Sequence, residues 1–261
     1  MDEKKFKCPE CGKEFDSKDI MLQHKKDAHP VKEEKQKKHV TKGRMLTYVI
    51  IAVIVLAIAG IAYWVITNSA SNPGSINSYN YSYVPFEGNN SAKINIIEFS
   101  DYQCPICGAF FTQTEPQLTT DYVNSGKSRF YFLDFAFLGP DSQTLAQGAW
   151  CANEQNLYYP YHDLIYSHQG TENTGWATPG KVEKLVTGIS GLNSQQFNTC
   201  LESQKYDSRV RQEAEVAANS GVQGTPTFFI GNPSIGFVTL VGNQAYSVFQ
   251  QTINSQLTKV S

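Results

Sequence analysis

Residues 94–111, INIIEFSDYQCPICGAFF, contain the feature around which the rest of the sequence is organised. The stretch begins as an apolar run rich in β-branched residues, which is typical of a short buried strand at 94–99. Residues 100–103 are expected to turn the chain. A helix should begin at Pro105, because the first helical position does not use the N–H that proline lacks. Cys104 would then lie at a helix N-terminus, where the partial positive charge lowers the pKa of a thiol.

A second cysteine, Cys107, follows Cys104 by one helical turn, within reach of a disulfide. A strand, a turn, C-x-x-C and a helix in this order form the redox arrangement of thioredoxin-like proteins. The alternative is half of a zinc site, which usually requires a second close pair of cysteines. The other cysteines of this region, Cys151 and Cys200, are far apart in sequence, so the pattern favours a redox pair.

The same stretch resembles the active-site segment of the DsbA-like thiol–disulfide oxidoreductases, a branch of the thioredoxin superfamily. Glu98 lies six residues before Cys104, where this superfamily has a buried carboxylate that helps to move protons. Residues 224–229, GTPTFF, are similar to the loop whose proline is cis and packs beside the active cysteines. Residues 150–155, WCANEQ, and 161–163, YHD, resemble the helical insertion of this branch. The resemblance covers about residues 93–257.

This resemblance implies an α/β thioredoxin-like fold with an inserted helical subdomain. A second buried strand is expected at 128–137, and residues 141–220 are expected to be mainly helical, ending with a helix at 208–219. Short strands at 227–230 and 237–241 and a final helix at 245–257 complete the predicted domain, which we place at residues 93–261. The redox domain is expected to need no cofactor.

The expected chemistry is attack of a substrate thiolate on Cys104, followed by resolution of the mixed disulfide. Alternation from Ile96 places Glu98 on the Ile96 face of its strand, which favours a buried proton donor for Cys107 over a satisfied surface carboxylate. Several strongly oxidising DsbA-like members have histidine at the position of Ile106, which cannot donate a hydrogen bond to a thiolate. The direction of electron flow therefore stays open.

The resemblance also implies a cis peptide bond between Thr225 and Pro226, which leaves the Thr225 backbone free to pair with an extended substrate peptide. Cys151 and Cys200 both fall in the predicted insertion. A disulfide between them is favoured over two buried thiols. By closing a loop in the unfolded chain, it would stabilise the folded state by about 4 kcal/mol. His162 is expected to pack within the insertion rather than to act in catalysis.

Residues 1–30 are expected to form a small ββα zinc finger. Two cysteines separated by two residues, then two histidines separated by four, match the C2H2 spacing: Cys8, Cys11, His24 and His29. Phe15 and Met21 occupy the positions of the two core hydrophobes. So short a segment needs a metal to fold, and this donor set closes a tetrahedral structural zinc site. The alternative is a disordered basic tail.

The finger lacks the residues expected of a zinc finger that recognises a specific DNA sequence. The three positions that face bases in this family fall on Ser17, Ile20 and Gln23, and Ile20 cannot hydrogen-bond a base edge. One finger also covers only about three base pairs. Sequence-specific DNA binding is therefore disfavoured, and the partner of the finger stays open between a protein and weak nucleic-acid contact.

Residues 45–66, MLTYVIIAVIVLAIAGIAYWVI, have no charged side chain and would span about 33 Å as a helix. This run is too long for a cleaved signal peptide and predicts a single transmembrane helix. Residues 1–44 contain 13 Lys and Arg against 9 Asp and Glu, including the basic cytoplasmic linker 31–44. The positive-inside rule therefore places the N-terminus in the cytoplasm and the redox domain outside.

The predicted topology separates the six cysteines by compartment. Cys8 and Cys11 stay in the reducing cytosol, where thiolates can hold zinc, and the other four face an oxidising exterior. Residues 67–92, rich in Ser, Asn, Tyr and Gly, are expected to form an extracellular linker. Asn80 and Asn89 begin N-x-S sequons in this linker, and their glycosylation stays open.

The sequence therefore predicts a membrane-anchored oxidoreductase that acts on the thiols and disulfides of exported proteins. The resemblance implies a quinone-linked membrane oxidase, of the DsbB or vitamin K epoxide reductase-like type, as electron acceptor. One alternative is the same domain acting as a reductase or isomerase. The other is a transmembrane redox sensor coupled to a cytoplasmic partner of the finger. The overall charge of −2 indicates no partner by itself.

Overall fold

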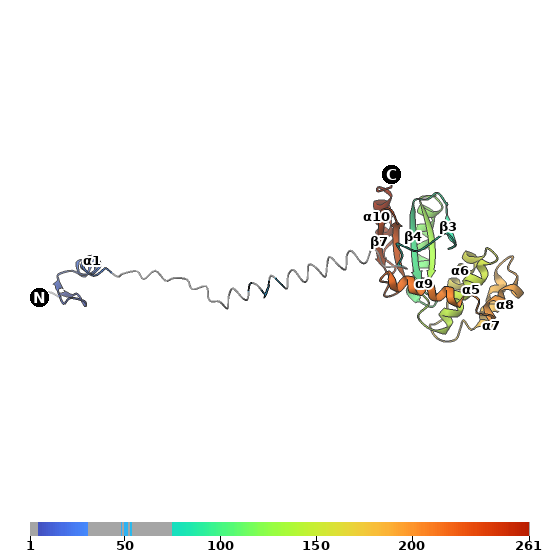
Figure 1. The fold of residues 1–261 in the computed structure, drawn as a ribbon, viewed down its shortest axis with the longest axis horizontal. Coiled ribbons are helices and arrows are strands. Elements are labelled where there is room, and N and C mark those ends of the chain that lie inside the picture. The colour runs from blue at the N-terminus through green and yellow to red at the C-terminus, as the bar shows by residue number, and fades with distance from the viewer. Residues whose placement is uncertain (1–4, 31–47, 49, 52, 54–74, 261) are drawn as a thin grey trace. The chain divides into compact units, whose positions relative to one another are not determined.

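The computed structural model consists of two compact units, residues 1–60 and residues 61–261 (Figure 1). The residues that the structure describes are 5–30, 48, 50, 51, 53 and 75–260. The predicted basic linker at 31–44 lies outside the described residues, as do nearly all of the predicted transmembrane helix at 45–66 and the linker residues 67–74. Within the parts that are described, no helix has the length and apolar character needed to cross a membrane.

The N-terminal unit is a ββα finger. Strand β1 (Phe6–Lys7) pairs antiparallel with β2 (Glu14–Phe15), and helix α1 (Lys18–Ala28) follows. Ser17 caps this helix, because its hydroxyl accepts a hydrogen bond from the Asp19 N–H at 3.2 Å. No residue of α1 is buried, so apolar packing alone contributes little to holding this unit together.

The C-terminal unit is built on a five-stranded sheet with the order β3-β5-β4-β6-β7. Its strands are β3 (Phe86–Gly88), β4 (Ile94–Ser100), β5 (Ser128–Asp134), β6 (Thr227–Asn232) and β7 (Gly236–Val241). The central strand β4 runs parallel to β5 and antiparallel to β6. All seven residues of β4 are buried, because both faces of the sheet are covered.

Two groups of helices cover the sheet. On the face of Ile94 and Ile96 lie α3 (Pro105–Gln113), α4 (Glu115–Leu118), the π-helical turn η1 (Thr119–Val123) and α10 (Tyr246–Leu257). The opposite face packs against the C-terminal part of α9 (Asp207–Asn219). The insertion gathers at one end of the sheet and comprises α5 (Pro140–Asn153), α6 (Tyr158–Ser167), α7 (Pro179–Leu185), η2 (Val186–Gly188) and α8 (Ser194–Glu202) (Figure 1). The fold is thioredoxin-like with an inserted helical subdomain.

Residues 75–92 belong to this domain, so the predicted linker at 67–92 is wrong over this part and the predicted boundary at 93 is too late. Ile76, Tyr79 and Val84 are buried against the sheet face that α9 covers. Strand β3 pairs with the edge of β5 in antiparallel register. The polar composition of the segment concealed these contacts, because its apolar residues follow neither a strand nor a helix period.

Arg209 of α9 contacts both residues 75–92 and the helical insertion. Its guanidinium carbon lies 4.2 Å from the ring centroid of Tyr83 and 4.3 Å from that of Trp150. Arg209 Nε also donates to the fully buried carboxylate of Glu213 at 2.9 Å, and Nη2 donates to the Tyr79 hydroxyl at 3.0 Å. One cation therefore joins three parts of the fold that are distant in sequence.

Strand β5 ends at Asp134, whereas the sequence predicted a strand to residue 137. After Asp134 the chain bends toward the turn that follows β4. The N–H groups of Phe137 and Leu138 donate to the Asp101 carboxylate at 3.0 and 3.1 Å. These bonds replace the ladder bonds that a longer strand would have made.

Candidate active site

The pair Cys104 and Cys107 lies at the start of α3. Cys104 is the N-cap residue, Pro105 occupies the first turn, and Cys107 follows one turn later. The Cys104 N–H donates to the Asp101 carbonyl at 2.9 Å, which closes the turn after β4. Both thiols are free, and Cys104 is the more accessible of the two, at 6% against 1%. The more accessible sulfur is therefore the one at which the sequence predicted attack by a substrate thiolate.

The two thiols differ in acidity. A hydrogen bond from the Cys107 thiol, together with the Thr225 side chain and the N–H groups of Cys107 and Ile106, lowers the pKa of Cys104 to about 6 against the opposing effect of burial. Burial raises the pKa of Cys107 well above its ordinary value. At neutral pH the site therefore holds a thiolate at Cys104 beside a protonated Cys107.

Glu98 lies beneath this pair on β4 and is 1% exposed. Burial raises the pKa of its carboxyl group to about 8, although a 2.7 Å hydrogen bond from the Ser100 hydroxyl opposes this rise. The charge of Glu98 in turn contributes to the raised pKa of Cys107. Glu98 shares the sheet face of Ile96, as strand alternation predicted, but alternation did not decide its burial, since every residue of β4 is buried.

Asp101 stabilises the turn that precedes Cys104. This role of Asp101 was not predicted from the sequence. Its carboxylate accepts from the Gln103 N–H at 2.9 Å and the Ser142 hydroxyl at 2.7 Å, in addition to the two backbone N–H groups that follow β5. Burial raises the pKa of Asp101, and these hydrogen bonds oppose the rise. An acidic residue in a turn is a weak sequence signal, since its four partners are revealed only by the fold.

Gln169, which follows α6, reaches the same turn from the insertion. Its amide nitrogen donates to the carbonyls of Tyr102 and Cys104 at 2.8 and 2.9 Å. A Cβ at Gly108 would lie only 2.3 Å from the Gln169 side-chain oxygen, so a larger residue there would displace the Gln169 amide from the turn. The insertion therefore helps to position the redox turn.

The loop containing Thr225 and Pro226 lies on the other side of Cys104. The peptide bond between them is cis, as the resemblance implied. The Thr225 carbonyl oxygen lies 3.4 Å from Cys104 Sγ. Thr225 is half-buried and Pro226 is buried. The structure thus brings Thr225 next to Cys104, and pairing of its backbone with a substrate peptide stays a prediction.

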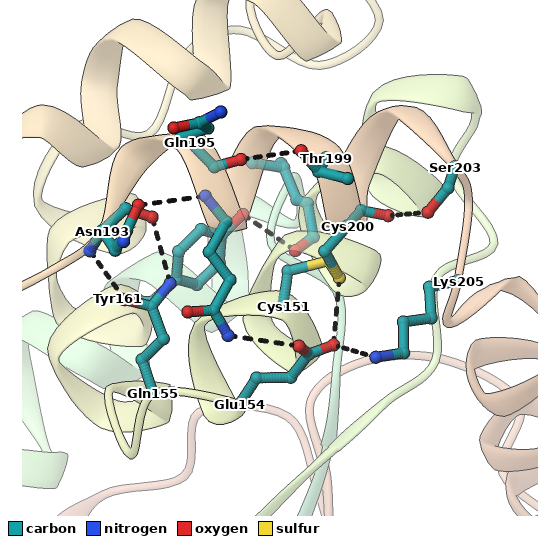
Figure 2. The surroundings of a disulfide bond; sticks show 12 residues. Cys151, Glu154, Gln155, Tyr161, Asn193, Gln195, Thr199, Cys200, Ser203 and Lys205 are labelled. Carbon is teal, nitrogen blue, oxygen red and sulfur yellow. Dashed lines mark hydrogen bonds and ion pairs between the residues drawn. A yellow bond between two sulfur atoms is a disulfide. The ribbon is translucent and has the colours of Figure 1, made fainter.

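The predicted disulfide between Cys151 and Cys200 is present and joins α5 to α8, with a Cα–Cα distance of 5.7 Å (Figure 2). A polar cleft of about 370 Å³ borders Cys200 and is lined in part by Glu154 and Lys205. His162, also in the insertion, is fully buried among aromatic rings such as that of Phe132, whose centroid lies 4.8 Å away. His162 therefore packs, as the sequence predicted.

The four predicted zinc ligands lie together in the finger. One donor atom from each of Cys8, Cys11, His24 and His29 lies within 4.8 Å of all the others. A tetrahedral zinc site with these ligands has donor separations of about 3.3 to 3.8 Å. His29 Nε2 is buried without a hydrogen-bond partner, while its Nδ1 lies 3.7 Å from the Glu10 carboxylate. A metal would satisfy this nitrogen, so the donor set fits zinc.

Two family models match the chain: one described as thioredoxin over residues 82–255, and one described as a C2H2-type zinc finger over residues 6–29. The probable disulfide bond formation protein D of Bacillus anthracis is 26% identical over 215 residues, covering 81% of this chain and 95% of that protein. Oxidised BdbD from Bacillus subtilis has a TM-score of 0.63 at 21% identity, covering 69% of this chain and 95% of that chain. DsbA from Chlamydia trachomatis has a TM-score of 0.61 at 22% identity, covering 70% and 95%. These two solved structures support the fold.

Proposed function

Since the chain belongs to the thioredoxin family and is a DsbA-like thiol–disulfide oxidoreductase, we propose that it forms or exchanges disulfides in exported proteins while anchored to a membrane. The observation that carries the proposal is the unequal acidity of the two thiols. Cys104 has a pKa of about 6 and is the more accessible, whereas Cys107 is buried and protonated. Such a pair can react with a client at one sulfur and release it through the other.

The oxidising cycle starts from a disulfide between Cys104 and Cys107. A client thiolate attacks the Cys104 sulfur, the enzyme disulfide breaks, and Cys107 leaves as a thiolate that takes up a proton. A second client thiolate then attacks the client sulfur of the mixed disulfide and expels Cys104 as a thiolate. The client gains a disulfide, and the enzyme retains the two electrons on two reduced cysteines.

The acidity of Cys104 favours the oxidising direction. A thiolate that is stable at neutral pH leaves readily and stabilises the reduced enzyme, which makes the disulfide a better oxidant. Ile106 limits the oxidising power of the disulfide, because its side chain is 50% exposed and has no polar group that could hydrogen-bond the Cys104 thiolate. Reduction or isomerisation by the same site is therefore the second candidate function.

We place the redox domain outside the cell membrane, held by the uncharged run 45–66, with the finger in the cytoplasm. Two observations support this arrangement: the basic residues precede the apolar run, and the domain contains a disulfide that persists in an oxidising compartment. Reoxidation then requires an electron acceptor, for which a quinone-linked membrane oxidase is the proposed partner. In the finger, the two thiolates and two imidazoles would hold zinc as a structural ion with no open position.

Trapping of clients tests the function. In Cys107→Ser, the Cys104 thiolate attacks a disulfide of an exported protein and expels one of its sulfurs as a thiolate. The resulting mixed disulfide should accumulate, because the variant has no Cys107 to resolve it. Cys104→Ser is the matched control and should trap none. Accumulation on the Cys104→Ser variant instead would show that the roles of the two cysteines are reversed.

Protease digestion of intact cells tests the topology. Residues after 67 should be cleaved by added protease, whereas residues 1–44 should be shielded. Digestion of the finger in intact cells would reverse the proposed orientation.

A further inference from the structure

A cleft of about 460 Å³ lies between the start of α5 and the loop that joins α6 to α7. We call it the α5 cleft. Its lining comprises Leu138, Gly139, Pro140, Asp141, Asn173 and Gly175. Neither the redox pair nor the loop that contains Pro226 lines it, so the catalytic chemistry described above does not account for this cleft.

The lining of the α5 cleft is hydrogen-bonded to the turn that precedes Cys104. The Leu138 N–H donates to the Asp101 carboxylate at 3.1 Å, and the Asn173 N–H donates to Gln103 Oε1 at 2.8 Å. Because Gln103 directly precedes Cys104, the second bond keeps Asn173 within about 12 Å of Cys104, a distance that about four residues of an extended peptide cover. A client whose sulfur reacts at Cys104 can therefore reach the cleft with a nearby side chain.

Asp141 is the one charged residue among those that line the cleft. It is 7% exposed, and Oδ2 of its carboxylate is buried without a hydrogen-bond partner among the described residues. Asp141 lies in the first turn of α5, where the helix N-terminus favours a negative charge. Burial of a carboxylate without a partner is costly, so its place in a cleft indicates a ligand with a positive charge.

The rest of the lining suits the stem of a long side chain. Hydrogen bonds from protein groups already reach the backbone carbonyls of Leu138, Gly139, Pro140 and Gly175. The Leu138 side chain and the Pro140 ring are apolar. Lysine and arginine place their methylene groups against such surface while the cationic head reaches a carboxylate. The α5 cleft combines both features.

Two further charges lie beside the cleft. Glu172 Oε1 lies 3.4 Å from Asn173 Nδ2, and Lys181 Nζ donates to the Gly175 carbonyl at 2.7 Å. Together with Asp141 they amount to two negative charges and one positive charge. The local field therefore also favours a cation over an anion.

From these contacts we propose that the α5 cleft binds a lysine or arginine side chain of the client, within about four residues of the cysteine that reacts with Cys104. Asp141 is then a specificity-determining residue. This inference rests on the proposed function, and it adds a side-chain preference that main-chain pairing at Thr225 would not supply.

Oxidation of two-cysteine peptides by the oxidised full chain measures this preference. The peptides differ at one position, which is lysine, glutamine or glutamate and lies about two to five residues to either side of the first cysteine. At the best position, the second-order rate constant of the unaltered chain should be about tenfold higher for lysine than for glutamine, and lowest for glutamate. This lysine-to-glutamine ratio should fall at about 0.5 M salt, because salt screens the charges.

Asp141→Asn keeps the size of the side chain and removes its charge. The variant should lose about tenfold of the lysine-to-glutamine ratio. Any effect of lysine on the acidity of the peptide thiol is the same for both enzymes, so it cancels in this comparison. Glu172→Gln is the matched control, because it removes a neighbouring carboxylate that does not line the cleft, and it should keep most of the ratio.

An unchanged ratio in Asp141→Asn would overturn the proposal. Equal losses in Asp141→Asn and Glu172→Gln would overturn it too, because they would indicate a general field rather than a bound side chain. If Asp141→Asn does not fold, the unaltered chain decides, and a ratio that does not respond to salt contradicts the ion pair. Oxidation of all peptides without a lysine preference would refute the cleft alone, whereas oxidation of none would refute the proposed function itself.

Discussion

Glu98→Gln should stabilise the redox domain at alkaline pH. In the wild type, Glu98 is fully buried with a pKa of about 8, against an ordinary value of 4.5. In the unfolded chain it ionises from about pH 4.5, whereas in the folded chain it stays protonated until about pH 8. The unfolded state therefore holds fewer protons over this window, and the free energy of unfolding falls as pH rises.

The size of this effect follows from the two pKa values. Each pH unit between 4.5 and 8 costs about 1.4 kcal/mol, so the full window costs up to about 5 kcal/mol. Glutamine is nearly isosteric, can accept the same hydrogen bond from Ser100 and does not titrate. The stability of Glu98→Gln should therefore match that of the wild type near pH 4.5 and exceed it by up to about 5 kcal/mol above pH 8.

Urea unfolding at a series of pH values measures this difference, followed by the fluorescence of Trp150 and Trp176. The enzyme should be in its oxidised form, so that Cys104 and Cys107 do not titrate. Buried carboxyl groups whose pKa does not depend on Glu98 titrate equally in both proteins and cancel in the comparison, whereas the pKa of Glu115 is raised in part by the charge of Glu98. Parallel stability curves across pH 4.5 to 8 would refute the assignment of Glu98 as a neutral buried acid.

Four further outcomes are expected. Replacing Cys151 and Cys200 by alanine should lower the free energy of unfolding by about 4 kcal/mol in urea titrations, and a loss below about 1 kcal/mol would contradict the loop-closure argument. Arg209→Ala should cost about 3 kcal/mol at pH 8, because Glu213 loses its cation, while Arg209→Lys should cost less; equal losses would assign the effect to ring stacking. Alkylation of Cys104 followed by mass spectrometry should have a pH midpoint of about 6, whereas a midpoint near 9 would disprove the lowered pKa. Chelation of zinc should make the finger sensitive to protease in the full chain without changing the thiol kinetics of the redox domain, and a finger that stays resistant would exclude a structural ion.

Local sequence patterns predicted the elements that carry the redox pair. The β-branched run predicted β4, and Pro105 predicted the start of α3 with Cys104 at its N-cap, since both depend on residues close in sequence. The cis bond before Pro226 came from the family resemblance, because no local rule selects it among the eleven prolines of the chain.

The parts that sequence reasoning missed depend on distant contacts. Tyr166 reaches Ser100 across 66 residues, and nothing in its helix distinguishes it from the neighbouring tyrosines. Strand β3 is only three residues long, and it forms because its backbone can pair with the edge of β5. Asp101 was read as part of a turn, whereas the four groups that it binds come from its own turn, from the loop after β5 and from α5.

A catalyst of disulfide exchange that contains a second disulfide is a potential client of itself. Burial does not protect that bond better than the redox pair, since Cys200 is 5% exposed and Cys104 is 6% exposed. The charges around the two sulfurs differ instead. The carboxylate of Glu154 lies 3.4 Å from Cys200 Sγ and forms an ion pair with Lys205 at 2.8 Å (Figure 2).

An attacking thiolate is an anion. Backbone N–H groups at the start of α3 favour an anion at Cys104, whereas the group beside Cys200 is a carboxylate paired with a lysine. The protein thereby discriminates between two chemically identical bonds by local electrostatics. We therefore expect exchange to occur at Cys104 and the disulfide that joins α5 to α8 to stay intact during turnover.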